Sequence, residues 1–95
     1  MKRFRVVLNG QNFDMGNGNV LGFITTRWVK AINSKLAEQV AVQLIQEDES
    51  IQSNIHNAVD DPPMIYVENM IEVGWFEFFT KSPGSGYTFY KDEKD

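Results

Sequence analysis

The chain has 95 residues, a net charge of −4 and no cysteine, and 42% of its residues are apolar. This length and composition predict one folded domain over residues 1–95. The lack of cysteine excludes disulfides, thiolate chemistry and cysteine-ligated metal centres. No apolar stretch approaches the ~20 residues that span a bilayer, and the first nine residues lack the apolar run of an export signal. We therefore expect a cytoplasmic protein with no membrane partner.

The N-terminal third of the chain predicts a β-hairpin. Residues 3–9 alternate between apolar and polar side chains, which indicates a half-buried strand. Residues 10–19 are rich in glycine and asparagine, the residues that tolerate positive φ, and they predict the hairpin loop. Residues 20–30 are β-branched and aromatic, which is typical of a strand.

An amphipathic helix is predicted over residues 34–47. If its apolar stripe packs on the sheet, Leu44→Ala should cost ~2–5 kcal/mol. The acidic run 47–49 lies at the helix end that disfavours negative charge, so we expect fraying there or a restart through residues 50–55. The stripe expected on the sheet consists of Leu36, Val40 and Leu44.

The rest of the chain completes an α+β fold. The prolines in residues 60–63 end helical structure, and residues 65–73 then alternate as a third strand. Residues 87–90 predict a short fourth strand, and residues 91–95 a disordered tail. A right-handed crossover would place the first strand between the second and third. We therefore predict a three- to four-stranded, mostly antiparallel sheet with one main helix on one face.

The charges are unevenly distributed along the chain. Residues 1–35 carry six bases and one acid, whereas residues 36–95 carry three bases and twelve acids. A basic region can mark a nucleic-acid surface. We favour neutralisation between neighbouring strands of one sheet, and so predict no nucleic-acid partner. The expected pairs join Arg3 and Arg5 to Glu68 and Glu72.

Few residues stand in patterns that support chemistry. His56 is the single histidine, and no catalytic or ligating partner lies at a suitable spacing. The loop after Asp14 weakly resembles a calcium loop but lacks the bidentate glutamate. Gly16 and Gly18 lack the strand–helix context of a phosphate loop. We predict no catalytic residue, no metal and no cofactor, and an enzyme is the less favoured interpretation.

Arg27 lies in a predicted strand that carries large apolar groups on both faces, so it needs a partner or an edge. As a functional group it could clamp a carboxylate or a phosphate. As a structural group it would pair with Glu68 or Glu72, or stack on an aromatic ring. We favour the structural interpretation.

Aromatic residues are concentrated between residues 75 and 90. One helix cannot cover both faces of a sheet, so this segment, a second subunit or a ligand must cover the other face. Neighbours in an extended segment point to opposite sides, and so these aromatics cannot all enter one core. The predicted partner or ligand surface comprises Phe23, Arg27, Tyr66, Trp75, Phe76, Phe78 and Phe79.

Together these features predict a small, non-enzymatic interaction module that forms a homodimer or binds an unidentified protein partner. A second interpretation is an antitoxin-like regulatory protein that acts through a protein partner. A third is a small-ligand-binding domain or enzyme that uses Arg27 with Tyr66 or Glu68.

Three segments carry a resemblance to a known family: GFITTRWV (22–29), DPPMI (61–65) and GYTFY (86–90). They resemble a family of small uncharacterised bacterial proteins, and the resemblance spans most of the chain. No activity is assigned to that family, so the resemblance implies no catalytic residue. The strand–strand–helix–strand order is also similar to small antitoxin sheets of the HicB type, in topology alone.

Overall fold

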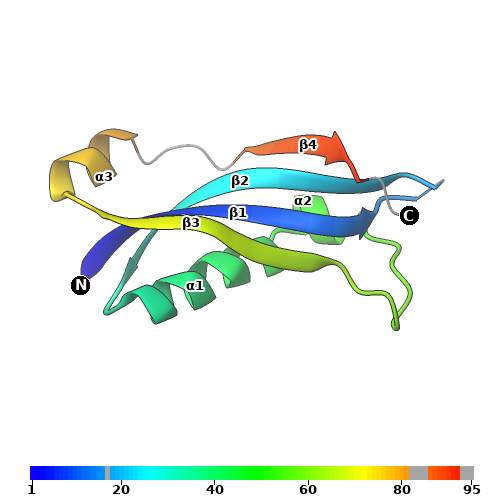
Figure 1. The fold of residues 1–95 in the computed structure, drawn as a ribbon, viewed down its shortest axis with the longest axis horizontal. Helices are drawn as coiled ribbons and strands as arrows, with labels where there is room; N and C mark the ends of the chain where they lie inside the picture. The colour runs from blue at the N-terminus through cyan, green and yellow to red at the C-terminus, as the bar shows by residue number, and fades with distance from the viewer. Residues whose placement is uncertain (17, 82–85, 93–95) are drawn as a thin grey trace.

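The computed structural model describes residues 1–16, 18–81 and 86–92 (Figure 1). The strands form one antiparallel sheet in the order β3-β1-β2-β4, and α1 packs against one face of it. This confirms the predicted α+β class and the central place of the first strand. In chain order the described elements are β1 (Lys2–Asp14), β2 (Val20–Ala31), α1 (Ser34–Gln46), α2 (Glu49–Gln52), β3 (Met64–Val73), α3 (Trp75–Lys81) and β4 (Tyr87–Lys91).

The core lies between α1 and the face of the sheet that is turned toward it. We call this side of the sheet the helix face and the opposite side the outer face. Alternate residues of β1 and β2 point to the helix face, where the rings of Phe13 and Phe23 lie 4.8 Å apart. The buried core residues are Phe4, Val6, Leu8, Phe13, Phe23, Val29, Ala31, Ala37, Ala41, Ile45 and Ile51.

The β1–β2 hairpin is longer than predicted. β1 continues through residues 10–14, so the predicted loop over 10–19 is wrong in its first half. The pairing of β1 with β2 shifts at this point, where Asn12 takes a φ of 62°. The amide of Asn12 donates to Asp61 Oδ1 at 2.9 Å and to the Pro62 carbonyl at 3.1 Å. These tertiary bonds hold a conformation that is uncommon outside glycine.

β3 contains a register shift that changes which residues reach the core. It pairs antiparallel with β1, and the shift lies opposite Val7 and Leu8. The extra residue reverses the alternation beyond it. Met70 therefore packs against the core, whereas Ile71 lies opposite Arg5 on the outer face. The predicted alternation over residues 65–73 would have placed Ile71 on the same face as Ile65 and Val67, and this expectation is wrong.

The helical segments begin where the side chains can cap them. Asn33 Oδ1 accepts the backbone N–H of Leu36 at 2.9 Å, so α1 starts at the predicted place. The chain then restarts as α2, as expected after the acidic run. Asp48 caps that helix by accepting the N–H of Ser50 at 3.0 Å. The carboxylate is favourable here because it lies at a helix N-terminus.

α1 buries a different stripe from the predicted one. The sheet-facing residues of α1 are Ala37, Ala41 and Ile45. Leu36, Val40 and Leu44 are 39%, 38% and 44% exposed, so the prediction for them is wrong. The apolar arc of the helix includes both stripes, and periodicity alone does not locate the centre of contact.

The C-terminal segment adds an edge strand. β4 pairs with residues 21–25 of β2, as predicted for a short fourth strand. Lys91 belongs to β4, and the Asp92 carboxylate accepts the N–H of Asn12 at 2.8 Å. The first two residues of the predicted tail are therefore held by the sheet, and residues 93–95 lie outside the described residues. No helix in the described part of the chain is long and apolar enough to cross a bilayer.

Neighbouring residues of α1 offer a matched test of its orientation. Ile45→Ala should lower the free energy of unfolding by ~2–5 kcal/mol, because Ile45 is fully buried. Leu44→Ala removes a similar side chain from a 44% exposed position and should cost clearly less. Chemical denaturation of both variants measures the difference. A larger loss for Leu44→Ala would show that α1 is rotated from this position.

Candidate functional site

The seven residues of the predicted surface do not form one site. Phe23 and Arg27 lie on the helix face of β2 and are buried. Tyr66 lies on the outer face of β3, opposite Asn9. The other four belong to α3, at the far end of the outer face (Figure 1). They are Trp75, Phe76, Phe78 and Phe79.

Arg27 is the buried cation of the helix face, with only 7% of its surface exposed. Its guanidinium lies 5.0 Å from the ring centre of Tyr87 and donates to the Tyr87 hydroxyl at 2.9 Å. It also donates to the Thr25 hydroxyl and the Thr26 carbonyl. The carboxylate of Asp48 lies 3.9 Å from the guanidinium. A buried charge needs this degree of compensation.

The Arg27 network joins three segments of the chain. The Tyr87 hydroxyl donates to Asp48 Oδ2 at 2.6 Å, so β4 is bonded to the junction of α1 and α2. Arg27 lies over an aromatic ring, as one of the predicted alternatives required, whereas the carboxylates predicted as its partners are not the ones it meets. Glu68 and Tyr66 lie on the outer face, so they cannot act together with Arg27. The tertiary fold supplies Asp48 and Tyr87 instead.

The network shifts two pKa values in opposite directions. Hydrogen bonds from Tyr87 and Ser50 lower the pKa of Asp48, because they favour its charged form. Burial, followed by the hydrogen bond to Asp48, raises the pKa of Tyr87 to about 12. The phenol therefore stays protonated as a donor between a buried cation and a carboxylate. This arrangement stabilises the fold. The guanidinium of Arg27, the hydroxyl of Tyr87 and the carboxylate of Asp48 already bond to one another.

Alkaline unfolding tests the network. The unfolded chain releases the phenol proton near pH 10, whereas folded Tyr87 retains it to about 12. Its contribution to stability is therefore complete below about pH 10 and is lost as the pH rises to about 12. Tyr87→Phe should make the stability fall less steeply across this window.

Tyr66→Phe is the matched control, because the Tyr66 hydroxyl contacts Met64 Sδ outside the network. Denaturation at several pH values compares both variants with the wild type. An identical slope for Tyr87→Phe and wild type would contradict the assigned role of Tyr87.

α3 covers one end of the outer face. The sequence interpretation treated residues 75–79 as extended, but they form a helix. Residues four apart on a helix lie on one side, so Trp75 and Phe79 contact each other with tilted rings whose centres lie 5.1 Å apart. Phe78 contacts Trp28 of β2 edge-to-face at 6.4 Å and anchors the helix to the sheet. The aromatic segment therefore covers part of the second face, as one of the predicted alternatives required.

Much of this aromatic surface remains open to solvent. Trp75, Phe76 and Phe79 are 60%, 72% and 53% exposed. Below α3, the outer face continues with the exposed side chains of Ile71 and Ile24. An aromatic patch of this kind is unusual on a monomer and commonly marks a site of interaction. We call α3 and the outer face together the outer surface.

Cations line the α3 end of the outer surface. Arg3 lies 5.9 Å from the ring centre of Phe79, and Lys30 lies 5.4 Å from it. Among the described residues, neither of these cations nor Arg5 pairs with a carboxylate. The Nε atoms of Arg3 and Arg5 are buried and have no hydrogen-bond partner among the described residues. The predicted neutralisation of both arginines is therefore wrong.

The register shift explains why the expected pairs do not form. Glu72 lies opposite Phe4 and pairs with Lys2 at 3.9 Å. Glu68, the residue next to the shift, accepts from Asn9 Nδ2 at 2.7 Å. Strict alternation along β3 would have placed these carboxylates beside the arginines. Lys30 was missed by sequence reasoning, although it alternates with the buried residues of β2 and so shares the outer face with Trp28.

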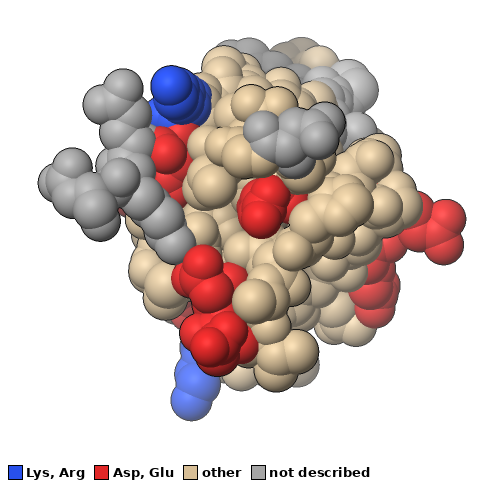
Figure 2. Space-filling model, turned by 90° about the vertical axis from the view of Figure 1, so that its right-hand side faces the viewer, with Lys and Arg blue, Asp and Glu red and all other residues tan. Residues whose placement is uncertain are grey.

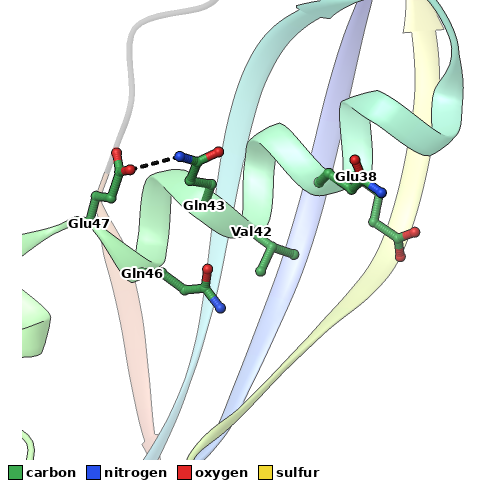
Figure 3. Close-up of a pocket in the computed structure, with 6 residues that line it drawn as sticks. Glu38, Val42, Gln43, Gln46 and Glu47 are labelled. Atoms are coloured by element: carbon green, nitrogen blue, oxygen red, sulfur yellow. Dashed lines mark hydrogen bonds between the residues drawn. The ribbon is translucent and has the colours of Figure 1, made fainter.

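Other features of the described chain are less suited to a specific site. Figure 3 shows a shallow depression on α1 in which Gln43 donates to Glu47 at 2.8 Å. The side chains of α1 and of its C-cap residue form it. His56 is exposed, and its backbone N–H donates to the Asp14 carbonyl at 2.7 Å. Within residues 1–16, 18–81 and 86–92, no three histidine, aspartate or glutamate residues gather as metal ligands.

Comparison of the chain with protein-family models, with curated proteins and with solved structures found no match. The resemblance to a bacterial family therefore stays a prediction. The functional argument rests on the outer surface itself.

Two neighbouring aromatics separate the anchor of α3 from its exposed surface. Phe78→Asp should lower the melting temperature, because Phe78 contacts Trp28, Phe79 and Lys30. Phe76→Asp introduces the same charge at a 72% exposed position and should leave the melting temperature close to that of the wild type. Thermal unfolding followed by circular dichroism measures both. Equal losses would mean that Phe76 belongs to the core.

Proposed function

We propose that this protein is a non-enzymatic interaction module and that the outer surface is its binding surface. The observation that carries the proposal is the exposure of three aromatic side chains on α3, Trp75, Phe76 and Phe79. Aromatic side chains provide large contact areas with little loss of conformational entropy, and they are enriched at the centres of protein interfaces.

The contacts of α3 support a preformed surface. Phe78 holds the helix on Trp28, and Arg3 and Lys30 lie over the aromatic rings. A partner would therefore meet aromatic side chains that are already in place, so less ordering entropy would be lost on binding. The cations beside the rings would favour a partner that offers carboxylates.

The contacts of the helix face also favour the outer surface as the binding surface. Arg27, the residue that the enzyme interpretation required, already bonds to Thr25, Thr26 and Tyr87. A ligand would have to break these bonds to reach its guanidinium. The outer surface requires no such rearrangement.

Site-specific crosslinking tests the proposal. A photoreactive amino acid at Phe76 should give covalent adducts with a protein partner, either in the source cell or in the purified protein. The same group at Gln39 is the control, because Gln39 is exposed on α1, on the other side of the sheet. No adduct from Phe76, or equal adducts from both positions, would exclude the outer surface as the binding surface.

A further inference from the structure

The outer surface carries opposite charges toward its two ends. Arg3, Arg5 and Lys30 lie in the half next to α3, and each lacks a carboxylate partner among the described residues. Glu68 lies near the middle of the outer face, at the register shift opposite Val7 and Leu8, and its carboxylate is bonded to Asn9 on the hairpin side. Beyond it, the hairpin end of the molecule shows more acidic than basic side chains on a mostly uncharged surface (Figure 2). Asp61 and Asp92 at this end are placed by their bonds to Asn12.

We propose that the outer surface binds a second copy of this chain, face to face and antiparallel. The two-fold axis would lie in the interface and cross the strands at the level of Val7. This inference rests on the proposed function and names its partner. An interface of this type is isologous, so each contact occurs twice.

The spacing along β1 determines the expected contacts. Arg5 lies two residues before Val7, and Asn9 lies two residues after it. The two-fold axis therefore brings Arg5 of one copy over Asn9 of the other. At this position Asn9 Nδ2 donates to the Glu68 carboxylate, and Asn9 Oδ1 accepts from the Tyr90 hydroxyl at 2.6 Å. Arg5 would thus gain the carboxylate that it lacks in its own chain.

The surroundings of Arg5 strengthen this contact. In its own sheet Arg5 lies between Ile71 and Trp28, which are apolar. A second copy would exclude water from this row, and an ion pair is stronger where water is excluded. The same burial makes an unpaired Arg5 costly in the dimer, so the contact provides orientation as well as affinity.

α3 fits the antiparallel arrangement. It lies at one end of the outer surface, so the two-fold axis carries it past the hairpin end of the second copy (Figure 1). A hollow of about 520 Å³ lies at that end. Its lining includes the apolar residues Pro63 and Met64 and the carboxylate of Asp92. The exposed aromatics of α3 and the cations beside them are complementary to such a lining.

Charge excludes the simplest alternatives. An axis parallel to the strands would bring the cationic halves of both copies together, at a cost in repulsion. An anionic membrane against the outer surface would meet Glu68 as well as Arg5.

The area of the outer surface is also large enough for a stable dimer. The molecule measures 43 × 24 × 23 Å, and its broad face exceeds the ~800 Å² that each partner buries in a standard interface.

Charge reversal in separate variants provides the test. The wild type should have twice the chain mass of 10.9 kDa by light scattering after gel filtration. Arg5→Glu and Glu68→Lys should each be monomeric, because each places two like charges in contact at two symmetric positions. Mixing the two variants should restore the dimer, because every contact then pairs a carboxylate with a cation.

The controls separate this inference from the proposed function. Lys35→Glu in α1 and Glu47→Lys at its C-cap make the same charge changes away from the outer surface and should remain dimeric. Circular dichroism verifies that all variants are folded. A monomeric wild type at its highest concentration, or a mixture that stays monomeric, would overturn the antiparallel dimer. Binding of the monomer to anionic vesicles would also overturn it. The proposed function would survive if Phe76 still crosslinks to a different protein.

Discussion

A single long helix can cover one face of a sheet but not both, and this constraint shapes the whole molecule. α1 and α2 bury the helix face, where the fully buried core residues of β1 and β2 lie. The outer face must then be covered by other means. The short helix α3 covers one end of it through the contact of Phe78 with Trp28. Exposed apolar side chains remain on α3 and on the rest of the outer face. The candidate binding surface is therefore a direct result of how this small core is built.

The buried Arg27 is the second feature on which the fold depends. A cation on the helix face requires compensation, and the chain provides it with Tyr87 and Asp48 from two distant segments. The network fixes the position of β4 relative to the start of α2. It also gives the acidic run after α1 a structural role, because Asp48 both caps α2 and accepts from Tyr87. Arg27 thus stabilises the scaffold, and the proposed binding surface lies on the opposite face.

Cations on the two faces of the sheet differ in their hydrogen-bond and ion-pair partners. Arg27 is enclosed by hydrogen bonds, whereas Arg3 and Arg5 lie on the outer face without carboxylate partners among the described residues. Glu68 lies on the same face, but the register shift in β3 places it near the middle of the face, where it bonds to Asn9 on the hairpin side. The cations therefore lie toward α3, whereas acidic groups lie from Glu68 toward the hairpin end. Such a surface is complementary to an inverted copy of itself, which is the physical basis of the proposed antiparallel dimer.

The sequence by itself determined the strand and helix types, the central place of β1, the N-terminus of α1 and the need to cover a second face. These depend on local periodicity, on capping residues and on the handedness of a crossover, all of which can be read along the chain. Only the tertiary structure decided which stripe of α1 is buried, because Ile45 and Leu44 belong to the same apolar arc. It also decided the partners of Arg27 and the separation of Arg5 from Glu68. One extra residue in β3 reverses the side-chain alternation, and pairing with β1, rather than composition, decides where that residue is placed.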